Sequence, residues 1–231
     1  SLKDVPMDLP DGFDLACVLE REDPRDALVS NRYATLAELP EGAKVGTSSL
    51  RRVVQLRAMR PDLVIEPVRG NLDTRLRKLD EGQFDAIVLA AAGLKRLGLA
   101  SRIRSVFEAG EMIPCAGQGA LGIEVRSDAT ALRGQLATLT HRPTWLAVHA
   151  ERAVSRALGG SCSMPLAAHA VWAGDTLRVD VALGDPEATD RPLLRATVEG
   201  AVADEAAATA LGTTAALRLR DQGAAGYLPA A

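Results

Sequence analysis

Residues 44–60 read KVGTSSLRRVVQLRAMR, and this stretch decides the fold because it joins a short strand to a helix. A strand is predicted over Lys44–Thr47, and Ser48-Ser49 open a helix that runs to about Arg60. Serine is favoured just before the first turn of a helix, and Pro61 cannot continue one. The stretch therefore predicts one strand–helix unit with a polar connection at the carboxyl end of the strand.

Two further units of the same kind follow along the chain. A β-rich run over Leu63–Val68 leads through Arg69-Gly70-Asn71 into a helix from about Leu72 to Leu79. A nearly unbroken apolar strand over Asp85–Ala91 precedes a short helical stretch, Leu94–Leu97. Apolar strands that alternate with helices are typical of a mostly parallel sheet covered on both faces. We therefore expect an α/β domain here.

The flanking segments indicate that this domain is inserted into another lobe. A strand is predicted over Phe13–Glu20, and the charged run Glu20–Asp23 before Pro24 is typical of a crossover between lobes. The glycine-rich connection Pro114–Gly119 leads into another strand, Ala120–Val125, which would return the chain to the first lobe.

A third region of a different type begins near His141. A long helix over Pro143–Leu158 has proline in its first turn and Gly159-Gly160 at its end, which is the expected polarity. Three antiparallel strands and a final helix are predicted beyond it, over Leu166–Trp172, Leu177–Leu183, Leu193–Val198 and Ala203–Arg220. This pattern predicts a small α+β domain.

The composition limits the classes of partner. A formal net charge of −3 argues against a nucleic-acid surface, and we expect no nucleic-acid partner. No apolar run has the length that spans a bilayer, and three cysteines without metal-type spacing are typical of a reducing cytoplasm. Of the 27 basic residues only Lys3, Lys44, Lys78 and Lys95 are lysines, so arginine dominates. Arginine binds carboxylates through two parallel hydrogen bonds, which favours small polyanionic ligands.

Polar and basic side chains follow two neighbouring strands of the predicted sheet. Thr47-Ser48-Ser49 with Arg51-Arg52 come after one strand, and Arg69-Gly70-Asn71 with Arg75 come after the next. Ligands of parallel sheets bind beyond the carboxyl ends of the strands, where helix N-termini also attract anions. Either group alone is equally compatible with a plain helix cap at Ser48 and solvated arginines. Both groups together favour a shared anion-binding cleft.

Other candidate residues are ambiguous when taken one at a time. Asp4, in Lys3-Asp4-Val5-Pro6, is by itself best interpreted as a turn residue. Cys162 follows Gly159-Gly160-Ser161 in a loop of small residues, which would leave a nucleophilic thiol accessible, although a lone cysteine is more often buried. No metal site is expected, since the three histidines lack metal-ligand spacing: His141, His149 and His169.

Several stretches together resemble the porphobilinogen deaminase family in order and spacing along nearly the whole chain. They are SLKDVP (1–6), EREDPRDA (20–27), GTSSLRR (46–52), RGN (69–71) with Thr74-Arg75, AAGLKRLG (91–98) and GQGA (117–120).

The resemblance implies an α/β fold with two lobes like those of periplasmic binding proteins and a smaller third domain. The domains would comprise residues 1–20 with 117–138 (the remnant of a catalytic first lobe), 25–113 (an arginine-lined α/β domain) and 141–231 (the α+β domain). It also implies a covalent dipyrromethane cofactor held by a thioether to Cys162. The implied reaction is a transfer in tetrapyrrole and heme biosynthesis. Four porphobilinogen molecules are joined into hydroxymethylbilane with release of ammonia.

The resemblance assigns roles to individual residues. Asp4 matches the catalytic aspartate, and Lys3 matches a contact beside the cofactor. The positions that match the family's carboxylate-binding arginines are Arg51, Arg52, Arg69 and Arg75. The positions expected to contact the cofactor or the chain of rings through hydroxyl, backbone or amide groups are Thr47, Ser48, Ser49, Gly70 and Gln118. Ser161 departs from the family's usual Gly-Gly-Cys loop.

The family has a further N-terminal part with more arginine, serine and lysine contacts, so we expect an incomplete first lobe and a polypeptide that is poorly active alone. Two alternatives are a two-lobed module that binds small anions without catalysis and an inactive fragment. We expect a cytoplasmic monomer that acts on porphobilinogen and has no membrane partner.

Overall fold

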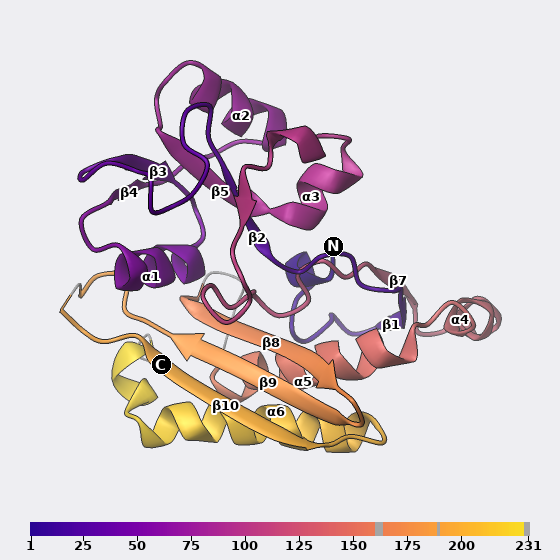
Figure 1. The fold of residues 1–231 in the computed structure, drawn as a ribbon. Coiled ribbons are helices and arrows are strands. Elements are labelled where there is room, and N and C mark those ends of the chain that lie inside the picture. The colour runs from indigo at the N-terminus through magenta and orange to yellow at the C-terminus, as the bar shows by residue number, and fades with distance from the viewer. Residues whose placement is uncertain (160–163, 189, 229–231) are drawn as a thin grey trace.

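The computed structural model describes residues 1–159, 164–188 and 190–228. Within these ranges the chain forms a five-stranded, a three-stranded and a two-stranded sheet. Figure 1 shows the five-stranded sheet with its helices on one side of the molecule and the three-stranded sheet with two long helices on the other. The N-terminus lies between these parts, beside the two-stranded sheet.

The five-stranded sheet has the order β4-β3-β5-β2-β6 and is mixed. Its strands are β2 (Asp26–Val29), β3 (Lys44–Gly46), β4 (Val64–Glu66), β5 (Ala86–Ala90) and β6 (Ser105–Val106). β3 pairs in parallel with β4 and β5, as predicted, whereas β2 is antiparallel to both β5 and β6. The sequence analysis did not predict β2, whose four residues are all buried, because a charged run and a proline precede it.

Helices cover both faces of this sheet, as expected from its apolar strands. They are α1 (Leu50–Met59), α2 (Leu72–Asp80) and α3 (Ala91–Arg96). Alternate residues of β5 point to opposite faces. Ile87 packs with Leu76 and Leu94 of α2 and α3, whereas Val88 packs with Leu56 of α1. The two cores hold α1 on one face and α2 with α3 on the other.

The two-stranded sheet pairs β1 (Phe13–Val18) with β7 (Gly122–Arg126) in antiparallel register. The N-terminal 3₁₀ helix η1 (Leu2–Asp4) is anchored on it, because Leu2 is fully buried and its N–H donates to the carbonyl of Ala120 at 3.0 Å. The following helix α4 (Thr130–Ala137) buries none of its residues, and the sequence analysis did not predict it.

The C-terminal part is the predicted α+β unit. Helices α5 (Arg142–Ala157) and α6 (Glu205–Asp221) lie side by side on one face of a sheet of β8 (Leu166–Ala173), β9 (Thr176–Leu183) and β10 (Leu194–Ala201) (Figure 1). Gly212 permits the close approach of the two helices, because a Cβ there would overlap the carbonyl oxygen of Ala150. The predicted fold class, an α/β region followed by an α+β unit, is confirmed. The three-domain boundaries stay a prediction.

A buried carboxylate ties the C-terminal unit to the two connections between the five-stranded and two-stranded sheets. The first connection is residues 20–24, and the second connection is residues 114–119. Glu151 of α5 is fully buried and binds Arg21 of the first connection through two hydrogen bonds of 2.6 and 3.2 Å. It also accepts from the backbone N–H of Gly117 in the second connection at 2.7 Å and from that of Ala170 on β8 at 2.8 Å. Arg21 Nε donates to the carbonyl of Gln118 at 2.8 Å, which closes the network.

We predict that Glu151→Gln lowers the free energy of unfolding by roughly 3 kcal/mol at neutral pH, because Arg21 loses its buried counter-charge. Burial alone would raise the pKa of Glu151, but Arg21 and His169 lower it from 4.5 to about 2. The carboxylate therefore stabilises the fold above about pH 4.5, and its contribution disappears as the pH falls towards 2.

Urea denaturation near neutral pH and near pH 3 measures this effect. The stability difference between wild type and Glu151→Gln is expected to shrink in acid, and an equal difference at both pH values would contradict the assignment. The control is Glu81→Gln, an exposed carboxylate after α2, which is expected to change stability by less than about 0.5 kcal/mol.

Candidate functional site

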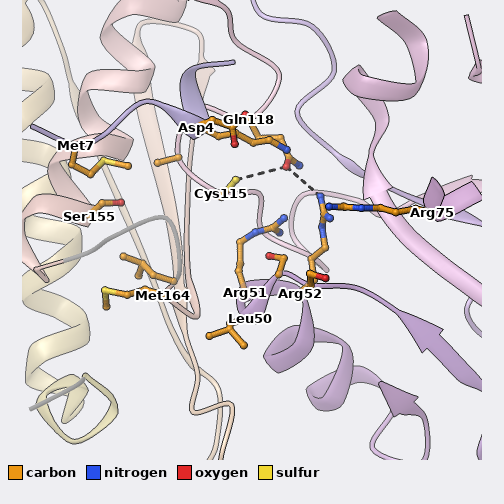
Figure 2. Close-up of a pocket in the computed structure, with 15 residues that line it drawn as sticks. Asp4, Met7, Leu50, Arg51, Arg52, Arg75, Cys115, Gln118, Ser155 and Met164 are labelled. Atoms are coloured by element: carbon orange, nitrogen blue, oxygen red, sulfur yellow. Dashed lines mark hydrogen bonds between the residues drawn. The ribbon is translucent and has the colours of Figure 1, made fainter. Parts of the chain in front are cut away.

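A cavity of about 320 Å³ opens where η1, α1, α2 and the C-terminal unit meet (Figure 2). Its wall combines basic side chains, hydroxyls and a few apolar groups. The lining residues are Lys3, Asp4, Met7, Ser48, Ser49, Leu50, Arg51, Arg52, Arg75, Cys115, Ala116, Gln118, Ser155, Met164 and Leu166. Most of the predicted site residues therefore lie in one place, although they come from distant parts of the chain.

The N-terminus of α1 supplies one wall of the cavity. Ser49 is the N-cap residue of α1, and its hydroxyl forms no capping hydrogen bond among the described residues. The Ser48 hydroxyl donates to the carbonyl of Val68 at 2.7 Å. Unpaired N–H groups in the first turn of a helix and the helix dipole favour an anion at this position. The plain helix-cap interpretation of Ser48 does not describe its contacts.

Arg51 and Arg52 are buried rather than solvated, with 2% and 6% of their surface exposed. Both bind Asp26 at the start of β2. Arg51 contacts its two oxygens at 2.7 and 3.2 Å, and Arg52 contacts Oδ1 through Nη2 at 2.8 Å and Nε at 3.0 Å. Gln118 Nε2 donates to the same oxygen at 2.9 Å. Burial alone would raise the pKa of Asp26, but the two guanidinium groups outweigh it and hold this pKa well below its usual range.

Positive charge dominates the cavity even after this pairing. Lys3, Arg51, Arg52 and Arg75 line it, and Asp4 is the one carboxylate among the described lining residues. Burial lowers the pKa of both Lys3 and Arg75, and the nearby Arg52 lowers each of them further. Such mutual repulsion is relieved when an anion binds. The cavity is therefore built for a ligand with several negative groups.

The Asp4 carboxylate lies on the same side of the cavity as Gln118, and Arg75 approaches from α2 (Figure 2). The Nε of Arg75 donates to the carbonyl of Gly70 at 2.8 Å. Gly70 has a φ of 119°, and a Cβ there would lie 2.7 Å from the Thr74 side chain. Glycine at this position therefore allows the turn that orients Arg75.

Three of the predicted site residues do not line the cavity. Thr47 is buried, and its Oγ1 accepts from the N–H of Ser49 at 3.3 Å. Arg69 is exposed, and Gly70 acts through the backbone contact to Arg75. Cys162 lies outside the described residues, but Met164, two positions later in sequence, lines the cavity.

Sequence reasoning did not single out two residues of the site. Asp26 lies in the motif EREDPRDA and in the predicted domain 25–113 but was assigned no role, although an aspartate that opens the apolar run Ala27–Val29 is a signal of a buried charge with a partner. Cys115 lines the cavity with its Sγ 3.7 Å from Gln118 Oε1 (Figure 2). Nothing in its local sequence distinguishes it from a structural cysteine.

No described helix is both long and apolar enough to cross a membrane. In the same ranges, no group of three or more histidine, cysteine, aspartate or glutamate side chains is placed to hold a metal ion.

The fold and the cavity define an α/β protein with a basic cavity that includes one exposed carboxylate. A family model described as "Porphobilinogen deaminase, dipyromethane cofactor binding domain" matches residues 1–134, and one described as "Porphobilinogen deaminase, C-terminal domain" matches residues 145–221. The chain belongs to the porphobilinogen deaminase family, a family of enzymes, and the resemblance predicted from the sequence motifs is confirmed.

Curated relatives agree with the family models. Porphobilinogen deaminase of Albidiferax ferrireducens is 67% identical over 220 residues, which are 95% of this chain and 70% of the relative. That of Ralstonia nicotianae is 59% identical over 225 residues, 97% of this chain and 67% of the relative. Among solved structures, a putative methionine-binding lipoprotein from Bacillus subtilis shares 15% identity with a TM-score of 0.41, covering 56% of this chain and 62% of its own. A likeness this distant says nothing about ligands.

The donor set of the cavity fits the dipyrromethane cofactor that the family model names. Basic groups outnumber carboxylates on its wall, as a cofactor with several carboxylates requires. In addition, Arg51 Nε is buried and has no hydrogen-bond partner among the described residues. Such an unsatisfied donor is costly in a finished structure and is expected to bind a ligand.

We predict that Arg75→Gln weakens binding of pyromellitate, a benzene ring with four carboxylates, about tenfold, because hydrogen bonds to charged groups contribute about 1.5–3 kcal/mol. Isothermal titration calorimetry measures the affinity. The control is Arg77→Gln on the same helix, whose side chain is 69% exposed, with an expected change below about twofold. Equal effects of the two substitutions would show that Arg75 does not contribute to the site.

Proposed function

We propose that this chain binds dipyrromethane in the cavity and catalyses the stepwise joining of four porphobilinogen molecules into hydroxymethylbilane, with release of ammonia. The observation that carries this proposal is a polybasic cavity that also presents one exposed carboxylate, Asp4. When bound, the cofactor supplies the pyrrole ring to which substrate units are added.

The basic residues bind and orient the substrate. Porphobilinogen carries an acetate and a propionate on its ring, so each added unit brings two carboxylates. Arg51, Arg52 and Arg75 provide guanidinium donors, and Ser49 at the N-terminus of α1 provides a hydroxyl for the same groups. These donors hold a pyrrole ring next to Asp4. Because the reacting groups are already held together, the reaction loses less entropy than one between separate molecules.

Asp4 is the proposed catalytic residue. Loss of ammonia breaks the bond between the aminomethyl carbon and its nitrogen, and the electron pair leaves with the nitrogen. The positive charge that develops on the pyrrole is stabilised by a nearby carboxylate. In its protonated form Asp4 is proposed to deliver a proton to the departing nitrogen, and the carboxylate that results recovers a proton from the pyrrole carbon at which the new carbon–carbon bond forms.

The cofactor is proposed to be held by a thioether to Cys162. Met164 and Leu166 line the cavity, so the chain directly after this cysteine reaches the cavity wall. Thr47 and Arg69 are proposed to support the residues that line the cavity. We also propose that the protein is a cytoplasmic monomer with the three domains predicted from the sequence: residues 1–20 with 117–138, 25–113 and 141–231.

A module that binds small anions without catalysis is the second candidate. The basic wall alone is compatible with it, but Asp4 weakens it, because a carboxylate on the wall repels an anionic ligand and contributes nothing to simple binding. The enzyme hypothesis therefore accounts for Asp4, and the binding-module hypothesis does not.

Incubation with porphobilinogen followed by intact mass spectrometry tests the proposed function. The expected result is a covalent adduct of two pyrrole units that Cys162→Ala abolishes. The matched control is Cys115→Ala, the other cysteine of the cavity, which is expected to keep the adduct. Absence of any adduct in all three proteins, or its loss only in Cys115→Ala, would refute the assignment.

A second prediction concerns Asp4. Asp4→Asn is expected to keep the adduct but to lower the rate of porphobilinogen consumption by about 100-fold or more, since an amide neither carries the negative charge nor transfers the proton. Asp8→Asn, an exposed aspartate four residues later, serves as the control with an unchanged rate. An active Asp4→Asn protein would remove Asp4 from the mechanism.

A further inference from the structure

Asp26 does not line the cavity, yet it binds three side chains that do. It is fully buried, and its carboxylate accepts five hydrogen bonds from Arg51, Arg52 and Gln118, as described above. A ligand in the cavity therefore meets the donors and not Asp26 itself. Any effect of Asp26 on binding acts through these three neighbours.

The first effect is geometric. The planar guanidinium group of Arg51 is held between Asp26 and the carbonyl of Ile113, at 2.7 and 2.8 Å. That of Arg52 is held between Asp26 and the carbonyl of Val88, at 2.8 and 3.0 Å. Because an arginine binds a carboxylate in the plane of its fork, fixing both planes fixes the directions from which an anion is accepted.

The second effect is electrostatic. Two adjacent buried guanidinium groups carry two positive charges, and Asp26 reduces their sum to one. A buried site with twice the charge would bind a polycarboxylate much more tightly, since a unit charge several ångströms away changes an affinity on the order of tenfold or more at an effective dielectric constant near 20. In the proposed reaction the bound chain of rings grows and is finally released. Binding its early forms too tightly would slow both the growth and the release.

We propose that Asp26 is a charge-balancing and positioning residue, which orients Arg51, Arg52 and Gln118 and keeps the affinity of the cavity for polycarboxylates moderate. This inference rests on the proposed function only in taking the ligand to be a polycarboxylate. If Asp26 had only a structural role, its loss would loosen the arginines and lower the affinity for a polycarboxylate. Loss of a charge-balancing residue raises this affinity instead.

The test is the affinity of the full chain for pyromellitate, measured by calorimetry at two salt concentrations. Intact mass spectrometry verifies that Cys162 carries the same adduct, or none, in every sample. Asp26→Asn keeps the shape of the side chain and removes its charge, while the carbonyls of Ile113 and Val88 still accept from the two guanidinium groups. Its affinity is expected to rise on the order of tenfold, with a steeper loss of binding at high salt. The matched control is Asp62→Asn. Asp62 is bound by Arg60 at 2.6 and 2.8 Å and is not among the residues that line the cavity, so the affinity of this variant is expected to stay unchanged.

A folded Asp26→Asn protein with unchanged or weaker affinity would overturn the proposal. If this variant does not fold, the double variant Asp26→Asn with Arg51→Gln is compared with Arg51→Gln alone. The double variant keeps one positive charge at this pair, whereas Arg51→Gln alone keeps none, so the double variant is expected to fold and to bind pyromellitate on the order of tenfold more tightly than Arg51→Gln. Equal or weaker binding by the double variant, or its failure to fold, would overturn the proposal. Failure of the proposed function would instead appear as a missing adduct on Cys162, so the two failures are distinguishable.

Discussion

Arg51 and Arg52 lie side by side inside the protein, and their burial constrains the positions of several other segments. Removing a guanidinium group from water costs several kcal/mol unless a counter-charge and hydrogen-bond acceptors replace the lost solvent. Arg51 and Arg52 receive them from Asp26 and from the carbonyls of Ile113 and Val88. The start of β2, the centre of β5, the N-terminus of α1 and the chain before the second connection must therefore meet at one place.

The same interaction reaches the C-terminal unit through Gln118. Its side chain donates to Asp26, while its backbone carbonyl accepts from Arg21, which in turn binds Glu151 of α5. Gln118 of the second connection thus links two buried carboxylates, Asp26 and Glu151, each of which binds arginine. Together with apolar contacts such as those of Val148 with Leu2, this arrangement ties the C-terminal unit to the segments that carry the arginines of the cavity.

The sequence predicted those elements whose apolar pattern or terminal residues are local. The strand and helix at residues 44–60 were predicted to within one or two residues, because serines precede the helix and Pro61 follows it. Strand β2 was missed because its first residue is charged and its pairing with β5 lies about 60 residues away. Helix α4 was not predicted: it is eight residues long, has Gly134 in its middle and buries none of its residues. For the site, local patterns placed basic groups at adjacent strand ends, but they could not show that Arg51 and Arg52 share an internal partner, since Asp26 is separated from them by 25 residues or more.

A crystal structure of the chain after incubation with porphobilinogen would show directly whether these arginines bind the cofactor. We expect electron density that is continuous with the Cys162 sulfur and extends into the cavity, with carboxylates bound by Arg51, Arg52 or Arg75 and a pyrrole ring beside Asp4. A free Cys162 thiol, or a bound oligopyrrole whose carboxylates contact none of these arginines, would contradict this expectation.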